Sequence, residues 1–85
     1  MIELDASAIS RILGAFPDCL DPRERQVIEM RLGLGGGPIL TLQHIGDTLG
    51  ISRERVRQLE KRSLRKLLHP TRLRKLNMIE SVKHV

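Results

Sequence analysis

The chain has 85 residues and a mass of 9.7 kDa, which is enough for one domain with a modest core. Phe16 is its only aromatic residue, which argues against a single-strand-binding surface built on several stacked rings. Its only cysteine, Cys19, excludes an internal disulfide and an all-cysteine metal site. No membrane-spanning run or signal peptide is visible in the sequence, so we expect a reduced, soluble, cytoplasmic protein.

The net charge of +5 is distributed unevenly along the chain. Residues 1–52 contain four Lys/Arg and seven Asp/Glu, a net charge of −3. Residues 53–85 contain eleven Lys/Arg and three Asp/Glu, a net charge of +8. This division predicts a scaffold followed by a surface that faces an anionic partner.

Five helical segments and no strand are predicted. The first covers about residues 9–16, where apolar side chains recur at i, i+3, i+4 and i+7. The second begins at a capping box formed by Asp21 and Glu24, with Pro22 in the first helical position, and runs to about residue 32. The glycine-rich stretch 33–37 lacks the lysine and the preceding strand of a phosphate-binding P-loop, so we interpret it as a connector.

The third segment begins at the N-cap Thr41 and ends at Gly50, a residue suited to a left-handed helix C-terminus. Ser52 caps a fourth helix that is predicted to reach about residue 68. His69 and Pro70 interrupt the pattern, and Pro70 can begin a fifth helix. The apolar stripe of that last segment consists of Leu73, Leu76, and Ile79 or Met78.

A short helix, a glycine turn and a longer basic helix form the outline of a helix-turn-helix. Apolar residues stand where the two helices must share a core, namely Ile45, Leu49, Ile51, Val56 and Leu59. Gly46 is small, as a close approach of the two helices requires.

At about 100° per residue, the fourth helix separates into an apolar and a polar face. The polar face carries Arg53, Glu54, Arg57, Gln58, Lys61 and Arg65. Arginine can donate two hydrogen bonds to guanine, glutamine can pair with adenine, and glutamate can accept from cytosine. We therefore favour reading of base edges in the major groove, although Glu54 can instead pair with Arg57 or Gln58 to stabilise the helix.

Over roughly residues 20–75 the sequence resembles region 4 of bacterial sigma-70 factors. The resemblance is carried by the run 51–60 (ISRERVRQLE), the segment 64–67 (LRKL) and the ending His69-Pro70. Upstream it includes the segments 21–25 and 30–34, with Thr41-Leu42 and Ile45-Gly46. The His-Pro ending is similar to that of primary and closely related sigma factors.

The resemblance implies an all-α domain of four to five helices that recognises the −35 promoter element as duplex DNA while attached to RNA polymerase. It implies that Arg53, Glu54, Arg57 and Gln58 read bases, and that Thr41, Arg55 and Lys61 contact the DNA backbone. It implies a contact with the polymerase β flap, with transcription activators or anti-sigma factors as further candidate partners. Expected partner or activator contacts are Arg62 and Arg65, together with Leu64 and Leu68, which can instead pack on the fifth helix.

We expect residues 1–20 to form an N-terminal helix of the domain or a linker, residues 21–76 the helix-turn-helix domain, and residues 77–85 a helix end or tail. A fragment of a longer sigma factor is favoured over a free-standing protein. Alternatives are a sigma-like adaptor that binds polymerase or a regulator, and the helix-turn-helix tail of a response regulator or recombinase. No catalytic constellation or zinc-ligand spacing is found around Cys19, His44, His69 and His84, so neither an enzyme, a metal nor a cofactor is expected.

Overall fold

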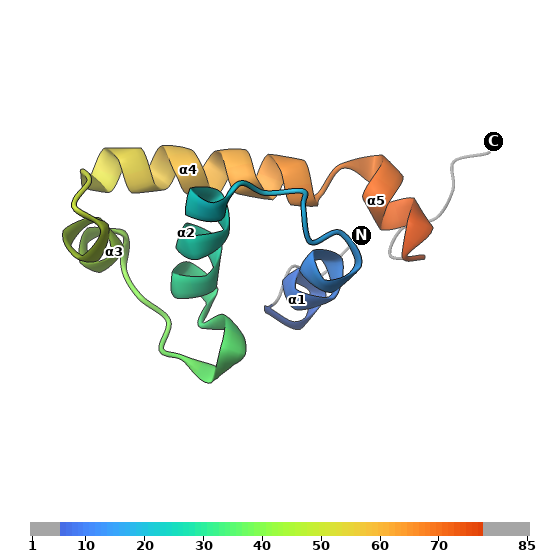
Figure 1. Ribbon diagram of the computed structural model, residues 1–85, viewed down its shortest axis with the longest axis horizontal. Helices are drawn as coiled ribbons and strands as arrows, with labels where there is room; N and C mark the ends of the chain where they lie inside the picture. Colours follow the sequence, from blue (N-terminus) through green and yellow to red (C-terminus); the bar gives the residue numbers. More distant parts are fainter. Residues whose placement is uncertain (1–5, 78–85) are drawn as a thin grey trace.

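The computed structural model describes residues 6–77, and Figure 1 shows its arrangement. It contains α1 (Ala6–Ala15), α2 (Pro22–Leu32), a short 3₁₀ turn η1 (Leu34–Gly36), α3 (Leu42–Leu49), α4 (Arg53–Leu67) and α5 (Pro70–Lys75). Since no strand occurs between residues 6 and 77, the predicted all-α class with five helices is confirmed. Met78 and Ile79, predicted for the last apolar stripe, and residues 78–85 of the expected tail lie outside the described residues.

Helix starts are fixed by the local hydrogen bonds that the sequence predicts. The Asp21 carboxylate accepts from the Glu24 amide at 2.8 Å, and the Glu24 carboxylate accepts from the Asp21 amide at 2.9 Å. Thr41 caps α3 and Ser52 caps α4 in the same way, by accepting from the amide three residues later. These bonds satisfy amides that have no partner inside the helix, which confirms the predicted capping residues.

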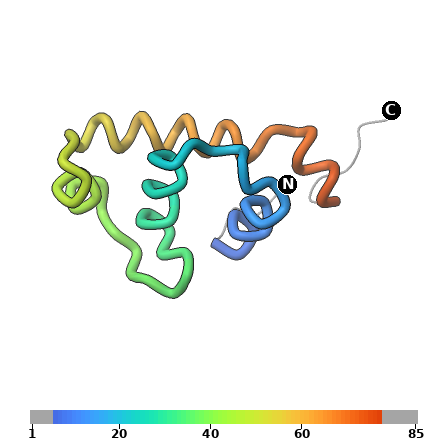
Figure 2. Tube along the Cα trace, viewed as in Figure 1, coloured from blue at the N-terminus to red at the C-terminus, as the bar shows by residue number. Residues whose placement is uncertain are grey.

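Helix α4 is the longest element, and the other helices are arranged along it (Figure 1). The tube in Figure 2 shows α3 at the N-terminal end of α4, α2 across its middle, and α1 towards its C-terminal end. α4 packs most extensively against α2 and α3. It therefore connects the helix-turn-helix formed by α3 and α4 to the rest of the domain.

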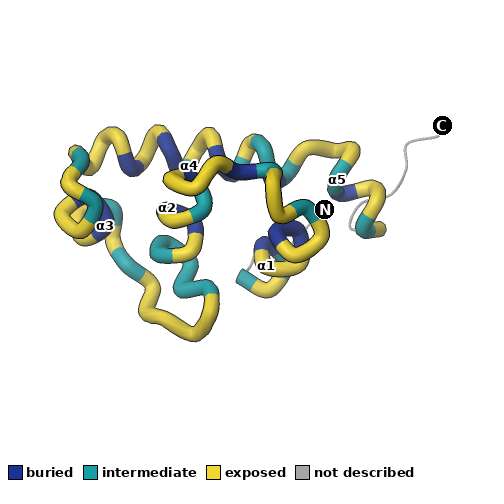
Figure 3. Tube along the Cα trace, viewed as in Figure 1, coloured by how far each residue is buried: buried dark blue, intermediate teal, exposed yellow. Residues whose placement is uncertain are grey.

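Two small apolar cores hold these helices together. In Figure 3 the buried positions along the helices are dark blue. The larger core joins α1, α2, α4 and α5 through Ile9, Ile12, Leu13, Leu20, Ile28, Leu67 and Leu73. The smaller core joins α2 to α3 and α4 through Val27, Ile45, Val56 and Leu59. Because consecutive residues of α2, Val27 and Ile28, enter different cores, this helix fixes α3 and α4 relative to α1 and α5.

The turn between α3 and α4 depends on two glycines. Gly50 has φ of 73°, in the left-handed region that glycine adopts without strain. At Gly46, a Cβ atom would lie 2.7 Å from the backbone oxygen of Ile51. The predicted close approach at Gly46 is thus confirmed, and it occurs between α3 and the turn that leads into α4.

Helix α5 closes the larger core from the C-terminal side. The Arg72 guanidinium lies 5.9 Å from the centre of the Phe16 ring, a cation–π distance. The Arg11 guanidinium donates to the Leu76 carbonyl at 2.6 Å. One contact joins α5 to Phe16, just after α1, and the other joins α1 to Leu76, just after α5. The second contact links residues that are 65 positions apart in the sequence.

Candidate nucleic-acid interface

The surface of α4 away from the cores is strongly basic. Its exposed residues are Arg53, Glu54, Arg55, Arg57, Gln58, Lys61, Arg62 and Arg65, that is, six cations and one carboxylate. The opposite side carries Val56, Leu59, Ser63 and Leu67, all of them buried. The sequence therefore predicted correctly which side of this helix faces solvent.

Glu54 is one of the four residues expected to read bases, which are Arg53, Glu54, Arg57 and Gln58, and all four are exposed. Arg57 donates to both Glu54 oxygens, from Nε at 3.0 Å and from Nη2 at 2.7 Å. The Arg57 hydrogen bond lowers the pKa of the Glu54 carboxyl against the opposing effect of desolvation, and the charge of Arg57, a Gln58 hydrogen bond and the charge of Arg53 add to the lowering. In turn Glu54 raises the pKa of Arg57. The pairing considered as an alternative use of Glu54 is thus present in the structure.

Arg55 and Lys61 are both exposed on α4. The Arg55 guanidinium donates a long hydrogen bond of 3.4 Å to the Gln58 side-chain oxygen. This contact leaves most of the Arg55 donors directed to solvent. Both cations are therefore accessible to a phosphate, and they lie on α4, the helix that begins with Arg53.

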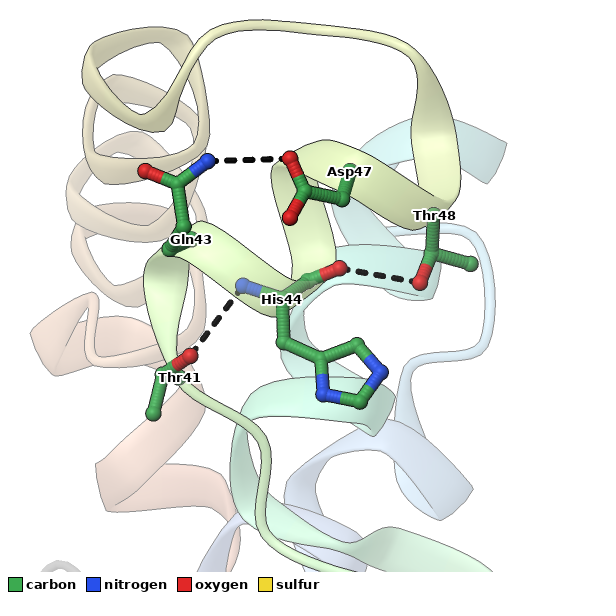
Figure 4. Close-up of a pocket in the computed structure, with 5 residues that line it drawn as sticks. All are labelled: Thr41, Gln43, His44, Asp47 and Thr48. Carbon is green, nitrogen blue, oxygen red and sulfur yellow. Dashed lines mark hydrogen bonds between the residues drawn. The ribbon is translucent and has the colours of Figure 1, made fainter.

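The N-terminus of α3 carries the remaining residue expected to contact the DNA backbone, Thr41. Figure 4 shows its side-chain oxygen accepting from the His44 amide at 3.1 Å. On the same outer surface Gln43 donates to Asp47 at 2.9 Å, and Thr48 donates to the His44 carbonyl at 2.9 Å. A hydroxyl that accepts a capping bond can still donate, so Thr41 can cap α3 and also donate to a phosphate.

Towards the C-terminal end of α4, Arg62 is occupied by an internal ion-pair cluster. Glu24 is fully buried and accepts from Arg62 Nε at 2.8 Å and from Lys66 Nζ at 2.8 Å. Asp21 lies 3.5 Å from a second Arg62 nitrogen. The sequence pointed to Arg62 only as a partner contact, and it missed that this arginine holds α4 against the start of α2. The available signal was the position of Glu24, three and four residues before Val27 and Ile28 and hence on the buried face.

A second polar link, also missed in the sequence, joins α2 to the helix-turn-helix. Arg31 Nε donates to Glu60 at 2.9 Å, and Arg31 Nη1 donates to the Leu40 carbonyl at 3.0 Å. One side chain of α2 thereby contacts α4 and the connector that leads into α3. No local pattern could reveal it, because Arg31 and Glu60 are 29 residues apart.

Leu64 and Leu68 are half-buried and pack against the larger core. Their remaining surface lines a shallow hollow, whose other members are Lys61, Arg65, His69 and Pro70. Packing within the domain and contact with a partner are therefore compatible for these leucines. Arg65 is exposed at the edge of this hollow.

Comparison with known proteins identifies the family. The family model described as "Sigma-70, region 4" matches residues 18–69, which is more than half of the chain. The chain belongs to the sigma-70 region 4 family. The matched residues contain α2, α3 and α4 in full, whereas α1 precedes them and still contributes three side chains to the larger core.

Individual relatives support this membership. The chain is 51% identical over 70 residues to "RNA polymerase sigma factor SigA" of Microcystis aeruginosa, an alignment of 82% of this chain and 17% of the relative. The chain is also 51% identical over 70 residues to SigA of Synechocystis sp., an alignment of 82% of this chain and 16% of that protein. A Bacillus sp. SigA is 41% identical over 75 residues, which are 85% of this chain and 20% of that protein. The region 4 chain thus spans a fifth or less of the length of these relatives.

Cys19 is half-buried against the larger core, and residues 6–77 contain no group of three or more His, Cys, Asp or Glu that could hold a metal ion. His84 lies outside the described residues. None of the described helices is long and apolar enough to cross a membrane.

Proposed function

We propose that this region 4 chain recognises the −35 promoter element as duplex DNA during transcription initiation, while bound to RNA polymerase. The observation that carries the proposal is the basic outer face of α4, on the second helix of a helix-turn-helix. In such motifs the N-terminal residues of the second helix contact base edges in the major groove. This role is one of binding in the bacterial cytoplasm and requires no catalytic group or cofactor.

Arg53, Glu54, Arg57 and Gln58 are proposed to read bases because they occupy the exposed first two turns of α4. Arginine can make a two-point contact with guanine, and glutamine can make one with adenine. A carboxylate can accept a hydrogen bond from cytosine N4. Thr41, Arg55 and Lys61 are proposed to contact phosphates. The positive ends of α3 and α4 favour the same anionic partner.

Arg57 and Lys61 provide a direct test, because they lie one helical turn apart on the same side of α4. We expect Arg57→Ala to weaken binding to a −35-like duplex by roughly 5- to 150-fold and to relax specificity at one base pair. Lys61→Ala should weaken binding to all sequences similarly and flatten the salt dependence, as loss of a phosphate contact does. Fluorescence anisotropy titrations on matched and scrambled duplexes, at two salt concentrations, measure both effects.

The scrambled duplex is the internal control for this pair of variants. If Arg57→Ala and Lys61→Ala both lost affinity equally on matched and scrambled duplexes, Arg57 would not read a base. Thermal unfolding of each variant should match the unsubstituted chain, since both residues are exposed on α4.

Attachment to RNA polymerase through the β flap is proposed from family membership and from the apolar surface that Leu64 and Leu68 leave in their hollow. Activators or anti-sigma factors are proposed to contact Arg62 and Arg65. Because Arg62 also binds buried Glu24, an Arg62 substitution disturbs the packing of α2 against α4 as well as any partner contact. Arg65 is therefore the cleaner position at which to test an activator.

We expect the isolated chain to bind promoter DNA only weakly and to gain affinity from polymerase. One module of this size covers roughly 600–1,000 Å² of DNA-facing protein surface. Tethering to polymerase makes the DNA contact effectively intramolecular, which raises the apparent affinity without new DNA contacts. A labelled −35 duplex is titrated with the chain at near-physiological salt, with and without core polymerase.

Affinity that rises when core polymerase is added would support the proposed tethering. Nanomolar, sequence-selective binding by the chain alone would refute it. Binding to polymerase without any DNA preference in either titration would favour the second candidate, a sigma-like adaptor.

A further inference from the structure

A second basic surface lies on α5, at the opposite end of α4 from α3 (Figure 1). Residues 61–77 contain seven Lys/Arg and no Asp/Glu. Two of these cations bind Glu24. The three cations of α5, which are Arg72, Arg74 and Lys75, form no ion pair with a carboxylate of the described residues. Cations gathered without a carboxylate favour an anionic partner.

Beside α5 the surface is hollowed by a volume of about 370 Å³. The residues that line this α5 hollow are Phe16, His69, Thr71, Arg72 and Lys75. His69 Nδ1 accepts from the Thr71 amide at 3.2 Å, so the neutral ring carries its proton on Nε2. Each polar side chain of the hollow can therefore donate a hydrogen bond, and Phe16 adds an apolar ring. This combination suits a ligand that is both anionic and partly apolar.

Arg72 is held in place within the α5 hollow. Its Nη1 atom donates to the Lys66 carbonyl, and its guanidinium lies 5.9 Å from the centre of the Phe16 ring. These contacts leave the Nε–H and Nη2–H donors without a partner among residues 6–77. That edge carries two parallel donors, which match the two oxygens of a carboxylate. A guanidinium that is already fixed loses little conformational entropy when a carboxylate binds it.

The position and shape of the α5 hollow favour a protein partner over DNA. α4 has 15 residues, so α5 is displaced by roughly 22 Å along the helix axis from the end that enters the major groove. Duplex phosphates belong to a wide and rigid backbone. A peptide, in contrast, can place one carboxylate and one apolar side chain in a hollow of this volume.

We propose that the α5 hollow binds an acidic segment of a partner protein. A carboxylate of that segment binds the free edge of Arg72 and the Lys75 ammonium, and a neighbouring apolar side chain packs against Phe16. The α5 hollow shares none of its lining residues with the base-reading surface of α4. This binding site therefore goes beyond the proposed function and does not depend on it.

The test uses a synthetic peptide of alternating Glu and Leu as the probe, and the same peptide with Gln in place of Glu as its control. Each is added to the ¹⁵N-labelled 85-residue chain at low ionic strength, and ¹H–¹⁵N NMR spectra follow the backbone amides. The proteins are the unsubstituted chain, Lys75→Gln, Arg72→Lys and Arg74→Gln. Arg74→Gln is the matched control, because Arg74 is exposed on the same helix but does not line the α5 hollow.

We expect the Glu–Leu peptide to cause saturable shifts that concentrate at Phe16 and residues 69–75. Arg72→Lys keeps the charge but loses the two-donor edge, so it should weaken binding roughly tenfold. Lys75→Gln should weaken it roughly 3- to 5-fold, and Arg74→Gln by less than about twofold. The Gln–Leu peptide should bind much more weakly than the Glu–Leu peptide to the unsubstituted chain.

Thermal unfolding of each variant accompanies these titrations, because Arg72 also contacts Phe16 and the Lys66 carbonyl. Lys75 is exposed and makes no such contact, so the result for Lys75→Gln stands even where Arg72→Lys loosens α5. Equal losses in Lys75→Gln and Arg74→Gln would indicate a diffuse attraction and overturn the proposal. Equal binding of the two peptides, or no saturable shift at residues 69–75, would overturn it as well.

A titration of the −35 duplex with the same variants separates a protein partner from DNA. We expect Lys75→Gln to change the duplex affinity by less than about twofold. A larger loss with the duplex than with the Glu–Leu peptide would show that the α5 hollow contacts phosphates, which would overturn the proposal. That outcome would leave promoter recognition by α4 standing.

Discussion

Glu24→Ala is expected to destabilise the domain by about 2–3 kcal/mol, because it removes the carboxylate shared by α2 and α4. Glu24 is fully buried and accepts from Asp21, Arg62 and Lys66. The cost stays below that of leaving a buried charge without a partner, because Arg62 and Lys66 are 49% and 40% exposed and can be rehydrated. Urea denaturation followed by circular dichroism measures the change.

The same cluster predicts how stability depends on pH. Burial alone would raise the pKa of Glu24, but hydrogen bonds from Lys66, the Asp21 backbone and Arg62 outweigh it and lower the pKa from 4.5 to about 2. The ionised carboxylate therefore stabilises the folded state above about pH 4.5, and this contribution is lost as the pH falls from about 4.5 towards about 2. The stability of Glu24→Ala should therefore fall much less than that of the unsubstituted chain over this pH range.

The control for Glu24 is Glu29→Ala, because Glu29 lies on the same helix and its side chain is 45% exposed. It should change stability by less than about 0.5 kcal/mol. Equal effects of the two substitutions would contradict the role assigned to the buried cluster, as would an unchanged pH profile in Glu24→Ala.

Gly46→Ala is expected to cost about 1–3 kcal/mol, because the new methyl group has no space at the helix-turn-helix crossing. Its Cβ would lie 2.7 Å from the Ile51 carbonyl oxygen, a backbone atom. The Ile51 amide in turn donates to the Gly46 carbonyl at 3.0 Å, so the turn cannot shift without losing a hydrogen bond. A shift there would also move α4 relative to α3, so promoter binding should weaken beyond the loss of folded protein.

Gly14→Ala is the matched glycine substitution, within α1. A Cβ at Gly14 would meet nothing within 4 Å, so alanine should be neutral or stabilise the helix by about 0.5–1 kcal/mol. Thermal unfolding of both variants measures the contrast. A destabilising Gly14→Ala or a harmless Gly46→Ala would contradict the packing described for these helices.

The fold could be predicted closely because its signals are local. Caps at Asp21, Thr41 and Ser52 act over three residues, and the glycine at position 50 needs only its own backbone conformation. The apolar face of α4 follows from helical periodicity alone. These features are present in the sequence whatever the rest of the chain does.

The links between distant charged residues could not be predicted in this way. Glu24 meets Arg62 and Lys66 across 38 and 42 residues, and the choice among many possible ion pairs is made only by tertiary packing. For the same reason the sequence left open whether Glu54 pairs with Arg57. The base-reading and backbone-contacting roles stay predictions, because they depend on contacts with DNA and not on contacts within the chain.

We propose above all that the outer face of α4 reads duplex promoter sequence. The most direct measurement is a competition titration of the unsubstituted chain, at low ionic strength, between a −35 duplex and duplexes of the same composition in shuffled order. We expect at least roughly tenfold preference for the −35 duplex, which Arg57→Ala should reduce by removing discrimination at one base pair. Equal affinity of the unsubstituted chain for the −35 and shuffled duplexes would contradict it.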